Sequence, residues 1–210
     1  SLVKHAPSPF VVWPWHDYGP TRYEGPQYTE EMYGDLLAHA WSYGAEFVTA
    51  ADAAGRIKGF TNSAITVTAI DADTIKVDVQ GSAQTGTGSL RFELASGRSI
   101  TSVDGWPAFT ADRVLLGEGD RSYTVHFADA AATVPHIRQL PMRASLQALT
   151  GENGSMGFSF VGAGVVELAM PAAAGAYKVD CGDAQTYADG VLQLHFASGG
   201  PHTCNVGYAL

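Results

Sequence analysis

The stretch AITVTAIDADTIKVDVQ, residues 64–80, decides the fold class of most of this chain. On both sides of its central Asp-Ala-Asp turn, apolar and β-branched residues alternate with polar ones, as they do in half-buried β-strands. We therefore predict that the chain is all β from residue 62 onward, built as one or more β-sandwiches. Similar short segments follow as far as the last residue: SLRFELA, RSITSV, RVLLGE, SYTVHFA, ASLQALT, GFSFVG, VVELAM, AYKVDC, VLQLHFA and TCNVGYAL.

A linker with two prolines, TVPHIRQLPMR at residues 133–143, separates two runs of strands. We assign the runs to two β-rich modules, residues 62–134 and 135–210. Both runs end in a strand that contains threonine, SYTVHF and HTCNVGY, which is compatible with a weak internal duplication. Two unrelated sandwiches, or one sandwich to which both runs contribute, fit the pattern equally well, and the topology stays open.

Residues 1–61 have a different pattern, which predicts a small βαβα segment. SPFVVWPW has the composition of a short buried strand, and a loop rich in Pro, Gly and Tyr follows it. Thr29 is a suitable N-cap for the helix TEEMYGDLLAHAWSYG, and Glu30 and Glu31 are well placed for the helix dipole. AEFVT, residues 45–49, is expected to form the next strand. Thr49 and Asp52 then form a pair resembling a capping box, which opens the helix AADAAGRIKGF.

Composition limits the partners of the chain. Hydrophobic residues make up 46% of the 210 residues, which suffices for a core, and the formal net charge is −9. The negative charge argues against nucleic acid and against an anionic membrane surface, because both attract Lys and Arg. No apolar run approaches the roughly 20 residues that span a bilayer. The chain starts at a serine without the pattern of a signal peptide, so we expect an excised part of a longer protein.

The first 60 or so residues resemble the closing segment of a NodB-type polysaccharide deacetylase domain. The resemblance rests on an apolar strand ending in Trp15 and His16, an aromatic loop, a helix, and the later signature carried by Gly44 and by residues 47–49. The segments GRSITSVDGWPAFTADRVLL, SYTVHF and HIRQLPMRASLQAL resemble the β-rich tails that follow such domains in large secreted bacterial proteins. The resemblance implies that this chain is the C-terminal region of a secreted deacetylase that acts on N-acetyl sugars.

The same resemblance implies that His16 is a catalytic acid that protonates the departing amine. In the family, a divalent metal, usually zinc, is held by an Asp and two His, and a second Asp serves as base. This sequence has neither an Asp-Asp pair nor an H-x-x-x-H spacing. We therefore expect no metal or other cofactor in this chain, no activity of the chain alone, and an upstream deacetylase domain in the same polypeptide. The alternative is a non-catalytic carbohydrate-binding or structural β module, in which His16 is an ordinary hydrogen-bonded residue.

Aromatic side chains are candidates for contact with a polysaccharide, because the faces of pyranose rings lie well on aromatic rings. We select Trp15, Tyr18 and Trp106, and expect Trp106 to be exposed because it stands between Gly105 and Pro107 in a segment that resembles a turn. Trp13 and Trp41 are instead expected in a core. No calcium-binding loop pattern occurs, so four aspartates of the first β run are expected to be solvated turn acids. They are Asp71, Asp73, Asp104 and Asp112.

The two cysteines, Cys181 and Cys204, both lie in strands of the second run. The low charge, the many short strands, the even number of cysteines and the family resemblance all favour an exported protein. We therefore predict a Cys181–Cys204 disulfide and a secreted, extracellular location. Two unpaired buried thiols are the alternative.

Overall fold

The computed structural model describes residues 29–43, 45–81, 88–152, 155–170 and 177–208. The chain divides into two compact units, Ser1–Thr49 and Ala50–Leu210. In the described ranges the protein is mainly β, as the alternating pattern predicted, with antiparallel pairing between its strands. None of the helices in those ranges is long and apolar enough to cross a membrane.

In the first unit the predicted helix is confirmed as α3 (Glu30–Ser42). The Thr29 hydroxyl accepts a hydrogen bond from the backbone N–H of Met32 at 3.2 Å, which is the expected N-cap. No residue of α3 is buried, and the Trp41 side chain is 59% exposed. The expectation that Trp41 belongs to a core is therefore wrong.

The strand expected at residues 45–49 does not form: this segment has no regular secondary structure. A strand is stable only beside another strand that satisfies its backbone groups, and no described strand pairs with these residues. The second strand of the predicted βαβα segment is thus absent. Its first strand, SPFVVWPW, lies outside the described residues.

The second unit begins with α4 (Ala50–Asn62), where the second helix was predicted. Ser63 follows the helix, and its hydroxyl donates to the Gly59 carbonyl at 2.6 Å, which satisfies one of the last helical carbonyls. Gly81 lies against this helix end. It has a φ of +70°, and a Cβ atom there would lie 2.9 Å from the Asn62 carbonyl oxygen, so only glycine fits.

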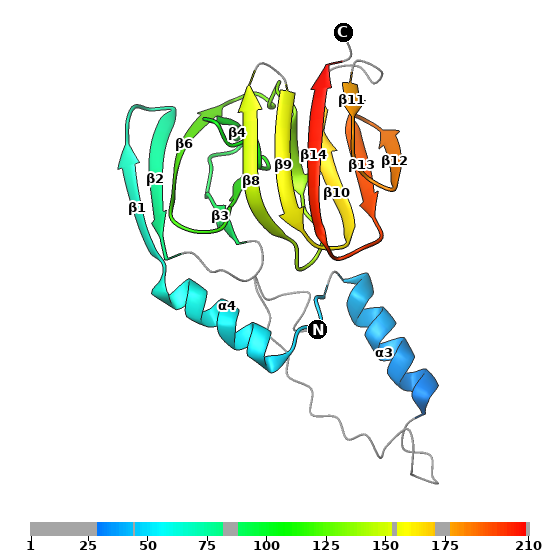
Figure 1. Cartoon of the computed structure of the whole chain (residues 1–210). Coiled ribbons are helices and arrows are strands. Elements are labelled where there is room, and N and C mark those ends of the chain that lie inside the picture. Colours follow the sequence, from blue (N-terminus) through cyan, green and yellow to red (C-terminus); the bar gives the residue numbers. More distant parts are fainter. Residues whose placement is uncertain (1–28, 44, 82–87, 153–154, 171–176, 209–210) are drawn as a thin grey trace. The chain divides into compact units, whose positions relative to one another are not determined.

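The first β run forms one four-stranded antiparallel sheet and a short ribbon (Figure 1). The sheet has the order β1-β2-β6-β4, in which β1 is Ala64–Ala69, β2 is Thr74–Gln80, β6 is Arg121–Ala128 and β4 is Ser99–Val103. The ribbon pairs β3 (Ser89–Arg91) with β5 (Arg113–Leu115). The stretch at residues 64–80 is therefore a β-hairpin, as its alternation predicted.

The second β run forms two sheets of four strands. One has the order β12-β13-β10-β7, comprising Ala184–Ala188, Val191–Phe196, Gly164–Ala169 and His136–Gln139. The other has the order β11-β14-β9-β8, comprising Tyr177–Val179, Pro201–Tyr208, Ser155–Val161 and Ser145–Glu152. The ring of Phe160 in β9 meets that of Phe196 in β13 edge to face, with centroids 4.9 Å apart. The two sheets therefore pack face to face.

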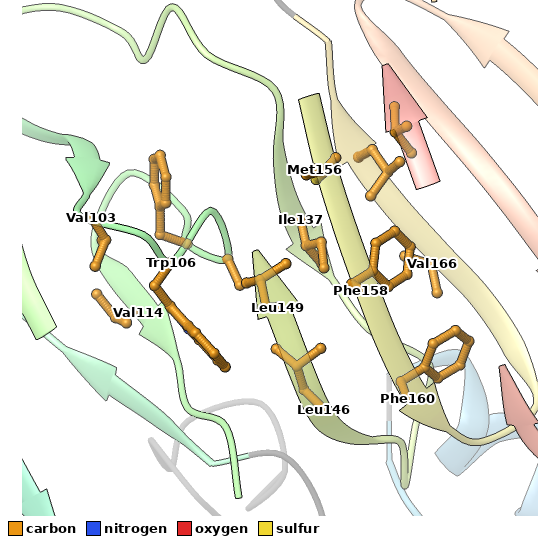
Figure 2. Packing of buried hydrophobic residues seen from close by; sticks show 14 of the residues in the cluster. Val103, Trp106, Val114, Ile137, Leu146, Leu149, Met156, Phe158, Phe160 and Val166 are labelled. Carbon is orange, nitrogen blue, oxygen red and sulfur yellow. The ribbon is translucent and has the colours of Figure 1, made fainter. Parts of the chain in front are cut away.

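One hydrophobic core joins both β runs. It includes Val114 and Trp106 from the first run and Leu149, Phe158 and Phe160 from the second (Figure 2). Ala108 forms a parallel β-bridge with Ile137, which connects the runs through the backbone as well. Described strands of both runs thus contribute to a single core across the linker.

His136 is buried in this core and is a source of acid sensitivity. Its ring stacks on that of Phe109, with centroids 4.1 Å apart, and its Nδ1–H donates to the Val134 carbonyl at 2.8 Å. Burial, with a smaller effect from the charge of Arg138, lowers the pKa of His136 below its ordinary value of 6.5. As the pH falls below 6.5, His136 becomes protonated in the unfolded chain but stays neutral in the folded protein. The free energy of unfolding therefore decreases until the pH reaches the lower pKa of the folded state.

We expect the midpoint of urea unfolding to decrease as the pH falls from about 7 to 5, and His136→Gln to flatten that slope. Unfolding curves at several pH values measure this, with His39→Gln, an exposed histidine of α3, as the control. An unchanged slope in His136→Gln would show that another group carries the dependence.

Candidate functional site

A trough that contains several polar side chains crosses the outer face of the sheet β11-β14-β9-β8. In β9, Met156, Phe158 and Phe160 are buried, so the alternate residues Ser155 and Gly157 face away from the core. The trough has a volume of about 740 Å³, within the range of ligand sites. It is lined by Gly105, Thr150, Gly151, Ser155, Met156, Gly157, Lys178, Asp180, Asn205, Val206 and Gly207.

The strand register arranges these groups in two rows across the sheet. In one row, Asn205 of β14 is opposite Gly157 of β9, which in turn is opposite Thr150 of β8. In the next row, Lys178 of β11 is opposite Gly207 of β14. Each row thus has a glycine with a polar side chain beside it.

The two glycines form the floor of the trough. A Cβ atom on Gly157 would lie 3.2 Å from both the Asn205 Oδ1 and the Thr150 Oγ1 atoms, and one on Gly207 would lie 3.3 Å from the Ser155 Oγ atom. Any larger residue would fill the space between these polar groups. The glycines therefore keep the hydroxyls and the amide open to a ligand.

Asp180 and Asn205 form a pair with two hydrogen bonds in the trough. The Asn205 backbone N–H donates to the Asp180 Oδ1 atom at 2.6 Å, and the Asn205 Nδ2 atom donates to Oδ2 at 2.7 Å. These bonds lower the pKa of Asp180 below its ordinary value of 3.8. The carboxylate stays ionised at neutral pH, and the amide is held with its Oδ1 atom toward Gly157. The pair offers hydrogen-bond acceptors, and Lys178 offers donors.

A disulfide fastens this edge of the trough. The predicted Cys181–Cys204 bond is confirmed, with 5.1 Å between the two Cα atoms. Val179 is opposite Val206 in the β11–β14 pair, so continuing the register places Cys181 opposite Cys204. The bond therefore ties the chain just beyond β11, which carries Lys178 and leads into Asp180, to the middle of β14.

Trp106 does not lie at a surface where it could contact a polysaccharide. Its side chain is only 5% exposed, its Nε1–H donates to the Leu115 carbonyl at 2.7 Å, and the Arg121 guanidinium lies 4.5 Å from its ring centroid. The predicted exposure is therefore wrong. The Gly-Trp-Pro sequence indicated a turn, but it did not indicate that the indole packs into the core formed by both β runs.

The four turn aspartates are bound to neighbouring groups. The Asp71 Oδ1 atom accepts a hydrogen bond from the Asp73 N–H at 2.8 Å, and Asp73 forms an ion pair with Arg98. Asp104 meets the His126 ring at 2.8 Å. Asp112 meets the Arg91 guanidinium at 3.2 Å. Across the ranges that the structure covers, no three His, Cys, Asp or Glu residues gather in a group suited to a metal ion.

His16, Trp15 and Tyr18, the candidate catalytic and sugar-contacting residues of the N-terminal segment, lie outside the described residues. The trough was not predicted from the sequence. Two signals pointed to it: Lys178 and Asp180 lie two residues apart, which places them on one face of an extended chain, and Gly157 and Gly207 interrupt strands that are otherwise well formed.

Comparison with known proteins adds no identification: the chain matches no family model, no curated protein and no solved structure.

Proposed function

We propose that residues 50–210 are a non-catalytic accessory module that contacts a polysaccharide outside the cell. The observation that carries this proposal is the trough, in which Asp180, Asn205 and Lys178 surround a floor of glycines. Sugar hydroxyls are both donors and acceptors, so a row of fixed carboxylate, amide, hydroxyl and ammonium groups is suited to them. The disulfide supports an oxidising environment, in which such bonds persist.

We propose that the trough recognises its ligand through hydrogen bonds, whereas the sequence had suggested stacking of sugar rings on aromatic side chains. The Asp180 carboxylate is already oriented by two N–H groups of Asn205, so a ligand hydroxyl meets it without further ordering of the side chain. A hydrogen bond to a charged group is stronger than one between neutral groups. Asp180 is therefore the residue whose removal has the largest expected effect on binding.

We expect Asp180→Ala to weaken binding of a β-linked oligosaccharide by about tenfold or more, the value of one charge-assisted hydrogen bond. Chitohexaose and cellohexaose are titrated into the full chain, and amide chemical shifts in NMR spectra report both affinity and location. The shifts should cluster at residues of β9, β11 and β14. Asp129→Ala, an exposed aspartate that follows β6, is the matched control and should bind as the unaltered protein does.

Three results would overturn the glycan proposal. These are no shift with either sugar at millimolar concentration, shifts confined to other strands, and equal losses in Asp180→Ala and Asp129→Ala. The dispersion of the amide spectrum shows independently whether each variant is folded.

A second proposal is that this chain belongs to a longer parent protein. We propose that the parent is a secreted polysaccharide deacetylase and that this chain is its C-terminal region. The support is the order of motifs in residues 1–60, in which His16 is the acid that protonates the leaving amine. The missing strand at residues 45–49 weighs against this assignment. In such a parent, upstream residues hold the divalent metal and supply the base. An Asp-Asp pair and an H-x-x-x-H motif in the sequence that precedes Ser1 would support this parent, and their absence would leave the accessory module alone.

A further inference from the structure

Strand β1 is uncovered on the face that its neighbour buries. Ile65 is opposite Val79, and Val67 is opposite Val77 in the β1–β2 pair, so the four side chains project from the same face of the sheet. Val77 and Val79 are 1% and 2% exposed, whereas Ile65 and Val67 are 50% and 60% exposed. The apolar face of the sheet thus continues onto β1, where at least half of each of these two side chains is exposed.

The backbone of β1 also has one open edge. The Ile70 N–H donates to the Thr74 carbonyl at 3.0 Å, and hydrogen-bonded positions alternate along an antiparallel pair. The backbone groups of the even-numbered residues therefore point toward β2, and those of Ile65, Val67 and Ala69 point away. No other strand in the described ranges pairs with this edge.

Natural edge strands are usually protected by a charge, a proline or a bulge. The segment AITVTA contains neither a charged residue nor a proline, and its register with β2 is unbroken. An edge of this kind is suited to pairing with another strand.

We propose that β1 pairs with β1 of a second copy of this chain, antiparallel, about a two-fold axis at Val67. In this register Val67 is opposite the partner's Val67, and Ile65 is opposite the partner's Ala69. All three residues whose backbone groups point outward then form hydrogen-bonded pairs. The apolar faces of the two copies join into one surface, because directly opposed residues share a face.

On the other face, this register places residues of opposite charge at the two ends of each row. Thr66 is opposite Asp78 and Thr68 is opposite Lys76, and Lys76 and Asp78 also pair within one copy at 3.0 Å. A two-fold axis at Val67 places Thr66 opposite the partner's Thr68. The row across the four strands then runs from Asp78 through these two threonines to the partner's Lys76. An axis at Thr66 would instead place Asp78 in one row with the partner's Asp78. It would also leave the outward groups of Ala69 outside the paired positions of β1. Backbone pairing thus selects the axis at Val67, and the order of charges along the rows agrees with it.

The oligomeric state of the full chain tests the proposal. Analytical ultracentrifugation over a range of concentrations should show a monomer–dimer equilibrium, and Val67→Lys should raise the dimer dissociation constant by about tenfold or more, because two ammonium groups meet at the axis. Thr186→Lys is the matched control on β12, another exposed edge strand, and should leave the equilibrium unchanged. A monomer at every concentration, or a dimer insensitive to Val67→Lys, would refute the pairing.

Cross-linking tests the register. Both native cysteines are in the disulfide, so a new cysteine is the only free thiol. Opposed residues of a hydrogen-bonded pair have Cα atoms about 5.5 Å apart, within the range of a disulfide, so oxidised Val67→Cys should form a covalent dimer. Ile65→Cys should not, because the two cysteines would be four residues out of register, about 13 Å apart. Cross-linking of Ile65→Cys as efficient as that of Val67→Cys would contradict the two-fold axis at Val67.

Discussion

Replacing Trp106 with alanine is expected to lower the free energy of unfolding by about 3–5 kcal/mol, the usual range for a buried aromatic residue. The indole lies in the core cluster with Val114 and Leu149, which come from different β runs (Figure 2). Its loss leaves the Leu115 carbonyl without the 2.7 Å hydrogen bond from Nε1. It also removes the ring that faces the Arg121 guanidinium.

The space around the indole is too closely filled for neighbours to replace it. A Cβ atom on Gly117 would lie 2.5 Å from the Trp106 Cη2 atom, and the Tyr123 ring meets the indole edge on, with centroids 5.7 Å apart. Because the surrounding strands are held by their own ladders, the cavity left by alanine closes only in part.

Urea unfolding followed by circular dichroism measures the loss. Trp41→Ala is the matched control, because its side chain is 59% exposed and its removal should change the stability by less than about 0.5 kcal/mol. Trp106→Phe should fall between the two, since it keeps a ring and loses the Nε1 bond. A loss below about 1 kcal/mol in Trp106→Ala would mean that the indole does not fill the core as described.

Removing the disulfide, by reduction or by the double change Cys181→Ala and Cys204→Ala, is expected to lower stability by about 3 kcal/mol. The bond closes a loop with a sequence separation of 23 residues, and the cost follows from the extra freedom of the unfolded chain. For a unit of this size, that loss corresponds to a fall in Tm of about 10 °C. Scanning calorimetry of the oxidised, reduced and double-variant proteins measures it.

The reduced protein and the double variant should melt at the same temperature, since they lack the same constraint. An unchanged Tm after complete reduction, verified by thiol titration, would contradict the expected contribution. We also expect oligosaccharide affinity to decrease in both, because Asp180 and Lys178 lie on the short segment that the bond secures.

Local patterns predicted the secondary structure well where each element is determined by its own residues. Residues 64–80 alternate strictly and form the β1–β2 hairpin, and the Thr29 cap begins α3 where the sequence indicated. Residues 45–49 are equally rich in strand-forming residues. They form no strand, because strand formation depends on a partner that the segment itself does not encode.

Tertiary features were predicted less well, because they depend on register and packing. The trough brings together Thr150, Gly157, Asp180 and Asn205, which belong to different strands or strand ends and meet only through the pairing of β8, β9, β14 and β11. The spacing of residues within a single segment cannot predict a site whose residues come from several strands. Trp106 shows the same limit, because its turn was recognisable whereas its burial depends on residues from both runs. The disulfide was predictable because only two cysteines exist to be joined.

The position of β14 sets the order in which this protein can be completed during synthesis. Residues 201–208 come after every other described strand in the chain, yet β14 lies inside its sheet, between β11 and β9. Until those residues have left the ribosome, or have passed through an export channel, β9 keeps an open edge and β11 has no neighbour. The glycine-floored trough therefore cannot form before residues 201–208 are available, and truncation before residue 201 removes it entirely.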